Sequence, residues 1–228
     1  MPIDLQLSVP EFFRGRARYS YPKSHPFPDH WSLRFRVFKK GLDVTLGLIS
    51  LPLIAGMALL LLVLNPWFNA GPVFFTQERL GRHRKPFWVI KFRTMTPANE
   101  GCRRGAEEAL EHDRITPLGA FLRKSRLDEL PNFLNVLRGE MSTIGPRPDS
   151  REHAELFLDT IPHYAYRYMV KPGISGLAQI EMGYAEGSEQ TALKAHYDQL
   201  YVEMSCGRLD AFIAWRTIRV MATCFGAK

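Results

Sequence analysis

Residues 44–64 read VTLGLISLPLIAGMALLLLVL, which is twenty-one consecutive residues without a charged side chain. As one straight α-helix, at about 1.5 Å per residue, this stretch would be about 31 Å long and would match the roughly 30 Å hydrocarbon core of a bilayer. The rest of the 228-residue chain is conspicuously basic. The stretch therefore predicts that the chain meets a membrane.

Two features argue against a single straight crossing. Pro52 lies inside the run with Ser50 beside it, so the helix has a place to bend, and the Ser50 hydroxyl can bond a carbonyl that the break leaves unpaired. Basic residues flank both ends, which the positive-inside bias would keep in the cytosol. We expect a re-entrant helix-break-helix over residues 34–66, with a spanning helix or a buried core helix as alternatives. The flanking basic residues are Arg34, Arg36, Lys39 and Lys40 before the run, and Arg79, Arg82, Arg84, Lys85, Lys91 and Arg93 after it.

The composition limits the remaining possibilities. Apolar residues make up 46% of the chain, which is enough for one well-packed domain and excludes a disordered or fibrous protein. Thirty Lys and Arg against twenty-three Asp and Glu leave a net charge of +7, which favours an anionic partner: nucleic acid, acidic lipid or a phosphorylated substrate. The three cysteines have neither zinc nor disulfide spacing, as expected for a reducing cytosol. We predict a polar arm over residues 1–33, the membrane segment over 34–66, and a cytosolic domain over 67–228.

A short β-hairpin is predicted after the apolar run. Residues 73–76 and 88–93 are rich in aromatic and β-branched residues, and a basic turn over 81–86 joins them. Residues two apart share one face of a strand, so Lys91 and Arg93 would lie side by side. Two adjacent cations suit a diphosphate, although a solvated strand face is an equally good interpretation of this motif alone.

Residues 127–148 carry the strongest chemical signal. Four leucines recur at helical spacing, and Asp128, Asn132 and Asn135 fall on a different face with Glu129 at its margin. Gly139 is the expected end of this helix. The four leucines are Leu127, Leu130, Leu134 and Leu137.

Asp128 is the candidate reactive group of this region. The helix N-terminus and the upstream Arg123, Lys124 and Arg126 are expected to favour its ionised form. An ionised aspartate among cations suits a nucleophile or a metal ligand, whereas an acidic pair in a first turn is more often a solvated cap. Downstream, prolines on both sides of Arg147 predict a stiff backbone from which this arginine could bind phosphate with both of its terminal nitrogens.

Taken together, these motifs resemble the bacterial sugar transferase family, the small monotopic phosphoglycosyl transferases. The resemblance covers about residues 35–220 and implies a mainly helical α/β fold, with a re-entrant membrane helix and one compact cytosolic catalytic domain that carries a small β-hairpin. The matching strings are GPVFF (71–75), QER (77–79), KFRTM (91–95), LDELP (127–131), NVLRG (135–139), GPRP (145–148), KPGISGLAQ (171–179) and YDQLY (197–201).

The resemblance also implies an activity. Asp128 would attack the β-phosphate of a nucleotide diphosphate sugar, with a UDP-sugar as the implied donor. Polyprenyl (undecaprenyl) phosphate would then attack the aspartyl phosphosugar, in the first membrane step of surface glycan or exopolysaccharide assembly. Glu129 would help to position or deprotonate the reacting groups. Mg²⁺ would bind at Asp128, with Asp198 as a further ligand. The phosphate-binding residues would be Lys91, Arg93, Arg123 and Arg147. The implied location is the bacterial inner membrane, with the catalytic domain facing the cytosol.

Two other classes of protein would account for part of these features. A non-catalytic membrane-surface protein would explain the charge and the apolar run, yet it gives no reason for Asp128 to lie among arginines. A nucleic-acid binder would use the positive charge but leaves the apolar run without a purpose. We therefore expect lipid and nucleotide sugar as partners and no nucleic acid, while the sequence leaves the donor sugar and the oligomeric state open.

Overall fold

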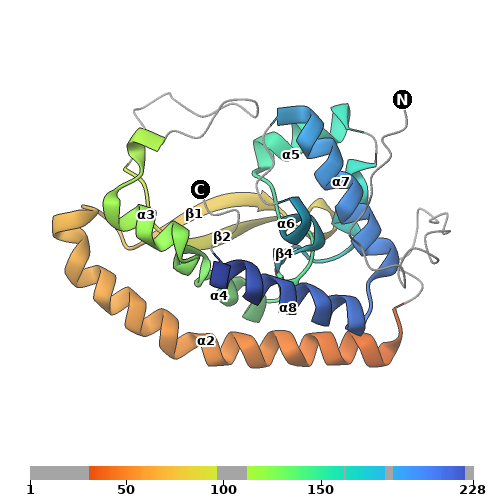
Figure 1. The fold of residues 1–228 in the computed structure, drawn as a ribbon, viewed down its shortest axis with the longest axis horizontal. Coiled ribbons are helices and arrows are strands. Elements are labelled where there is room, and N and C mark those ends of the chain that lie inside the picture. The colour runs from red at the N-terminus through yellow and green to blue at the C-terminus, as the bar shows by residue number, and fades with distance from the viewer. Residues whose placement is uncertain (1–30, 97–111, 162, 183–186, 224–228) are drawn as a thin grey trace.

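The computed structural model describes residues 31–96, 112–161, 163–182 and 187–223. The polar arm predicted over residues 1–33 lies almost entirely outside this range. The described part is mainly helical with two small sheets, which agrees with the predicted fold class. In Figure 1 the long helix α2 (Leu33–Phe68) runs along one edge of the molecule, and the other described elements lie on one side of it.

Helix α2 is a single helix of 36 residues, about 54 Å long at the usual rise, that continues through Pro52 and Pro66. Figure 1 shows it changing direction part-way along, in the orange portion of its course. The Ser50 hydroxyl donates to the Gly47 carbonyl over 2.7 Å, a local bond that bends helices. The predicted bend is thus present. The predicted helix-break-helix is nevertheless wrong in one respect, because the two halves remain one continuous helix.

Most of α2 is not covered by protein. Its buried residues recur every three, four or seven positions and form one narrow stripe, whereas apolar residues such as Leu59 and Leu62 are more than 60% exposed. Only 22% of its most apolar window is buried, whereas the core helix of a soluble protein is mostly buried. By length and composition, α2 could cross a membrane. The stripe consists of Lys39, Asp43, Gly47, Ser50, Ile54, Leu61 and Asn65.

The predicted hairpin is confirmed and is longer than expected. Strands β1 (Phe74–Leu80) and β2 (Pro86–Phe92) pair antiparallel, with Phe75 opposite Lys91, and the 3-10 turn η1 (Arg82–Arg84) closes the tip. Phe92 packs with Ile54 and Leu61 of α2. The aromatic content of the strands therefore joins the hairpin to the long helix.

The single leucine-rich helix predicted from residue 127 to Gly139 is wrong. Helix α3 (Pro117–Lys124) is capped by the Thr116 side chain and ends at Lys124, and Arg126, two residues further on, is left-handed with φ 59°. A 3-10 turn η3 (Leu127–Glu129) and a short helix α4 (Asn132–Leu137) follow. Pro131, which has no amide hydrogen to donate, separates the two. The leucines still share one face despite this break. Leu127, Leu130 and Leu134 pack on the cluster that contains Ile54 and Leu61 of α2, and Leu137 lies against Gly47.

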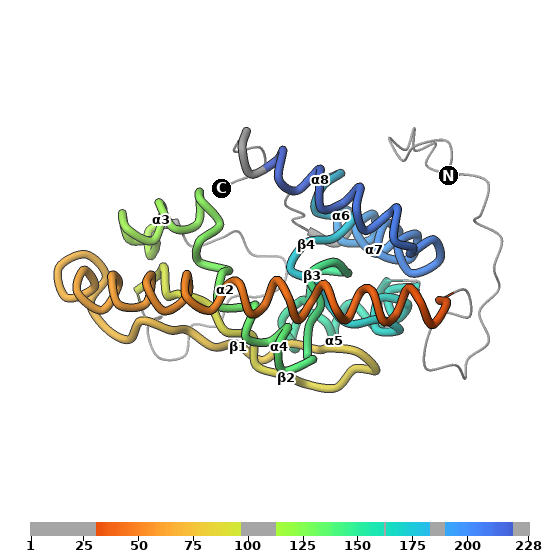
Figure 2. Tube along the Cα trace, turned by 90° about the horizontal axis from the view of Figure 1, so that it is seen from below, coloured from red at the N-terminus to blue at the C-terminus, as the bar shows by residue number. Residues whose placement is uncertain are grey.

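A second, parallel sheet was not predicted from the sequence. It pairs β3 (Ser142–Ile144) with β4 (Gly173–Ser175), each only three residues long. In Figure 2, α2 passes across these elements, with α4 and the hairpin on one side and α8 on the other. In α8, Leu209 and Ile213 are fully buried while Trp215 and Ile218 are exposed, so only one face of this helix packs in the core. The remaining elements are η2 (His112–Arg114), α5 (Arg151–Thr160), η4 (Tyr164–Met169), α6 (Leu177–Met182), α7 (Gly187–Met204) and α8 (Gly207–Thr223).

Candidate active site

Three of the predicted site residues meet at the turn η3. Glu129 is buried there, and its carboxylate accepts a hydrogen bond of 2.8 Å from Lys91 Nζ of β2. Arg147 binds the same carboxylate with both terminal nitrogens, one of them 2.9 Å from Oε2. We call Lys91, Asp128, Glu129 and Arg147 the Glu129 cluster.

The two acids of this cluster differ in their ionisation. Burial alone would raise the pKa of Glu129, but the charges and hydrogen bonds of Arg147 and Lys91 outweigh burial and hold this pKa well below its usual range. Burial also lowers the pKa of Lys91, an effect that Glu129 opposes. This low pKa favours the ionised form of Glu129 as the partner of two cations.

Asp128 has the opposite character. Its pKa is raised, first by burial and then by the charge of Glu129, with Lys91, Arg147 and Arg123 partly opposing the shift. The expectation that its surroundings would favour the ionised form is therefore wrong in direction, because a 3-10 turn half-buried in the protein replaces the exposed helix N-terminus. Among the described residues, no hydrogen bond or ion pair engages the Asp128 carboxylate. Its oxygens are free to react or to coordinate.

Asn135 brings β2 to this turn. Its fully buried amide accepts from the Ile90 amide over 3.1 Å and donates to the Trp88 carbonyl over 2.7 Å, so α4 pairs with β2 through one side chain. The polar helix face predicted around Asn135 therefore binds backbone, and it places Lys91 within reach of Glu129.

Arg147 projects from a segment, residues 145–149, that we call the Arg147 loop. Two cationic side chains bind backbone carbonyls of this loop: Arg167 binds the Arg147 carbonyl, and Arg79 binds the Pro148 carbonyl over 2.7 Å. The Gly173 amide donates to the Pro146 carbonyl over 2.9 Å. A Cβ on Gly145 would lie 2.5 Å from the Lys171 carbonyl, so only glycine fits there. These tertiary contacts add to the constraint that the prolines place on this backbone.

A second ion-pair cluster lies behind this loop, and the sequence did not reveal it. Asp149 binds Arg167 and, over 2.5 Å, Lys194, while Asp198 lies 2.9 Å from Arg167. Arg167 and Lys194 hold the pKa of Asp149 far below its usual range against the effect of burial, whereas burial raises that of Asp198 to about 6. These four residues, the Asp149 cluster, come from distant parts of the chain and carry no common motif.

The structure does not bring all predicted residues together. Asp128 and Asp198, the predicted metal ligands, belong to separate clusters, and Arg167 of the second cluster binds the backbone carbonyl of Arg147 from the first. Arg93 lies just beyond the end of β2, so the strand alternation that would have placed it beside Lys91 no longer applies. Its guanidinium binds the Asn69 carbonyl and packs on Gly71, where φ is +125°. Arg123 reaches Asp128 only through its charge.

The fit of a metal ion rests on Asp128 alone. Within the described ranges, no group of three or more His, Cys, Asp or Glu side chains could hold a metal. Magnesium commonly takes one or two carboxylates and completes its shell with water and substrate phosphates, so the unengaged oxygens of Asp128 meet the minimal requirement. Asp198, paired with Arg167, does not contribute to the same site.

Known proteins resemble this chain over most of its length. A protein of Aeromonas hydrophila named UDP-N-acetylgalactosamine-undecaprenyl-phosphate N-acetylgalactosaminephosphotransferase is 41% identical over 195 residues, which are 85% of this chain and 46% of that protein. A UDP-glucose:undecaprenyl-phosphate glucose-1-phosphate transferase of Klebsiella pneumoniae is 39% identical over 80% of this chain and 39% of its own length. The chain thus spans less than half of these two relatives.

A third relative is matched over almost its whole length. A putative undecaprenyl-phosphate N-acetylgalactosaminyl 1-phosphate transferase of Bacillus subtilis is 38% identical over 71% of this chain and 90% of that protein. Residues 34–224 match the bacterial sugar transferase family, a range that includes α2, the hairpin and both ion-pair clusters. The chain therefore belongs to the bacterial sugar transferase family.

Proposed function

We propose that this protein transfers a sugar 1-phosphate from a UDP-sugar to undecaprenyl phosphate, as the first membrane step of exopolysaccharide or related glycan assembly. The names of the similar proteins describe this reaction with different sugars. One observation in the structure carries the proposal: two adjacent carboxylates are sharply different, because Glu129 is engaged by Lys91 and Arg147, whereas Asp128 accepts no hydrogen bond from any residue that the structure describes.

This difference suits a covalent mechanism. An oxygen of the Asp128 carboxylate attacks the β-phosphorus of the donor; a P–O bond forms, the bond to the bridging oxygen breaks, and uridine monophosphate leaves with that oxygen. An oxygen of undecaprenyl phosphate then attacks the same phosphorus and releases Asp128, giving undecaprenyl diphosphate sugar. Partial burial leaves the attacking carboxylate poorly solvated and hence more nucleophilic.

The cations around Asp128 supply the electrostatic part of this proposal. Lys91 and Arg147 lie within hydrogen-bonding distance of Glu129, which holds them beside the reacting carboxylate, and Arg123 adds a third positive charge. Charge that develops on phosphate oxygens would be stabilised there. Asp128 would also hold a magnesium ion, whose chemistry would be to neutralise the donor diphosphate. Arg93 as a phosphate ligand stays a prediction.

A membrane location follows from the acceptor and from α2. The acceptor is a lipid, and the exposed apolar surface of α2 is the surface that lipid would cover. The bend at Ser50 and Pro52, together with the basic flanks, supports a re-entrant helix that returns to the cytosolic face of the inner membrane. The catalytic domain, residues 67–228, would then lie at the level of the lipid headgroups.

The test is uridine monophosphate release from a panel of UDP-sugars by the purified protein, with and without undecaprenyl phosphate. With acceptor withheld, the true donor should leave a sugar phosphate on Asp128, visible by mass spectrometry, and Asp128→Asn should abolish both signals. If Asp128→Asn releases the nucleotide at the unmodified rate, the mechanism is wrong. A protein that binds vesicles but turns over no UDP-sugar would support the alternative, a membrane-surface binding protein.

A further inference from the structure

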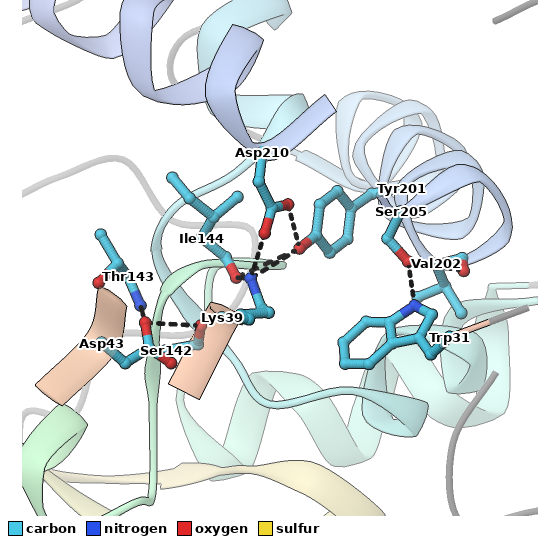
Figure 3. A network of polar contacts seen from close by, with 10 residues as sticks. All are labelled: Trp31, Lys39, Asp43, Ser142, Thr143, Ile144, Tyr201, Val202, Ser205 and Asp210. Atoms are coloured by element: carbon cyan, nitrogen blue, oxygen red, sulfur yellow. Dashed lines mark hydrogen bonds and ion pairs between the residues drawn. The ribbon is translucent and has the colours of Figure 1, made fainter. Parts of the chain in front are cut away.

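The buried stripe of α2 is polar over its first half, although the helix is the most apolar segment of the chain. Lys39, whose side chain is 10% exposed, donates to Asp210 over 2.6 Å, to the Ile144 carbonyl over 2.9 Å and to the Tyr201 hydroxyl over 3.2 Å. All three donors of the ammonium group are thus used. Figure 3 shows this cluster between α2, α7 and α8.

Asp43, one turn further along α2, makes a second attachment. Its Oδ1 accepts from the Thr143 amide over 2.8 Å and from the Ser142 hydroxyl over 3.1 Å, so it binds the first two residues of β3 while Lys39 binds the third (Figure 3). Just before α2, the Trp31 indole donates to the Ser205 hydroxyl over 2.5 Å. The beginning of the long helix is therefore bound to the catalytic domain by directional polar contacts.

Strand β3, which Lys39 and Asp43 of α2 bind, leads directly into the Arg147 loop. Ile144 is followed by Gly145, whose amide donates to the Ser175 carbonyl over 2.8 Å and whose backbone touches Gly173. This close contact leaves the segment between Ile144 and Arg147 little freedom to absorb a shift of β3. Among the described residues, three cationic side chains bind carbonyls between residues 144 and 148: Lys39, Arg79 and Arg167. Lys39 belongs to the membrane helix, whereas Arg79 and Arg167 do not.

We propose that Lys39 and Asp43 are positioning residues of the transferase site: they transmit the depth and rotation of the membrane helix to Arg147, and through Arg147 to Glu129. This inference rests on the proposed function. It also adds to the role of Lys39, which the sequence predicts only as one of the flanking cations that keep the helix ends in the cytosol; its side chain binds Asp210 inside the protein. Lys40, which is exposed, remains available to the headgroups.

Asp43 offers a matched pair of variants. Asp43→Asn keeps an oxygen at Oδ1 that can accept both hydrogen bonds, whereas Asp43→Ala removes the acceptor. We expect Asp43→Ala to lower kcat for uridine monophosphate release about ten- to hundredfold, as small displacements of catalytic groups do. Asp43→Asn should stay close to the unmodified protein, and the KM for the UDP-sugar should change little in either. Gly41→Ala, on the exposed side of the same turn with open space around it, is the control for altering this helix.

A second measurement keeps the inference separate from the proposed activity. Hydrogen exchange followed by mass spectrometry should show faster exchange in a peptide that covers residues 145–150 for Asp43→Ala and Lys39→Met, but not for Asp43→Asn or Gly41→Ala. This readout needs no substrate, so it decides the coupling even if no UDP-sugar is turned over. If exchange in residues 145–150 is unchanged in folded Asp43→Ala, or if Asp43→Asn is as impaired as Asp43→Ala, the inference is overturned.

Discussion

Arg147→Lys tests whether the two-point contact with Glu129, and not merely a positive charge, organises the site. Lysine keeps the charge but can make only one of the two hydrogen bonds that Arg147 makes to the Glu129 carboxylate. The side chains are 23% and 10% exposed, so the lost bond lies in a partly dry environment. A hydrogen bond to a charged group contributes about 1.5–3 kcal/mol, so we expect a loss of about 2 kcal/mol.

The assays are thermal unfolding and uridine monophosphate release. For a chain of this size, a loss of about 2 kcal/mol should lower the Tm by about 4–8 °C. If the same interaction operates in the transition state, release should slow about thirtyfold. Arg151→Lys is the matched control, because Arg151 makes its ion pairs with Glu155 and Glu78 at the surface, where screening by water leaves little to lose. A variant Arg147→Lys that matches the unmodified protein in both assays would refute the two-point contact as the organising feature.

Three further predictions concern pH and topology. Glu129→Gln removes the negative charge that helps to raise the pKa of Asp128, so the acidic limb of its pH–rate profile should move to lower pH even though kcat falls; an unmoved limb would contradict this coupling. The pKa of Asp198 is raised to about 6, above the value near 4 of an unfolded chain, so the folded protein binds this proton more tightly and loses stability, by roughly 3 kcal/mol, as pH rises between these two values. Asp198→Asn cannot titrate, so its Tm relative to the unmodified protein should improve from pH 4 to pH 7, and a constant difference would show that Asp198 is not the titrating group. Replacing both Ser50 and Pro52 with alanine should straighten α2, so that in part of the population a cysteine placed before Leu33 is labelled from the periplasmic side. Labelling confined to the cytosolic side would show that the bend does not determine the topology.

Local chemistry predicted much of the fold. The hairpin and the long apolar helix both follow from patterns of neighbouring residues. The wrong prediction of one helix between Leu127 and Gly139 also has a local cause. The helical spacing of the leucines continues across Pro131, whereas the α-helical backbone does not. The leucines still share a face, so the pattern predicted the packing better than it predicted the helix.

The site was harder to predict, since its contacts join residues far apart in the chain. Lys39 and Asp210 are 171 positions apart, and nothing near Lys39 distinguishes it from its neighbour Lys40. The four residues of the Asp149 cluster are similarly dispersed. The sequence singles out Lys91, Glu129 and Arg147 as candidate site residues, but it does not predict their contact with one another, because the expected role of both cations was to bind a ligand.

The spacing of the buried stripe on α2 has a practical consequence for protein engineering. Each residue inserted into this helix turns everything beyond it by about 100°, so a single insertion between Asp43 and Ile54 would keep the polar attachments and swing the apolar ones away from the hairpin. A chimera that borrows the hydrophobic segment of another transferase must therefore preserve the number of residues from 39 to 65, and not only its length in the bilayer. The buried positions of α2 are thus specific to the domain that they contact, and another apolar helix of equal length would not reproduce them.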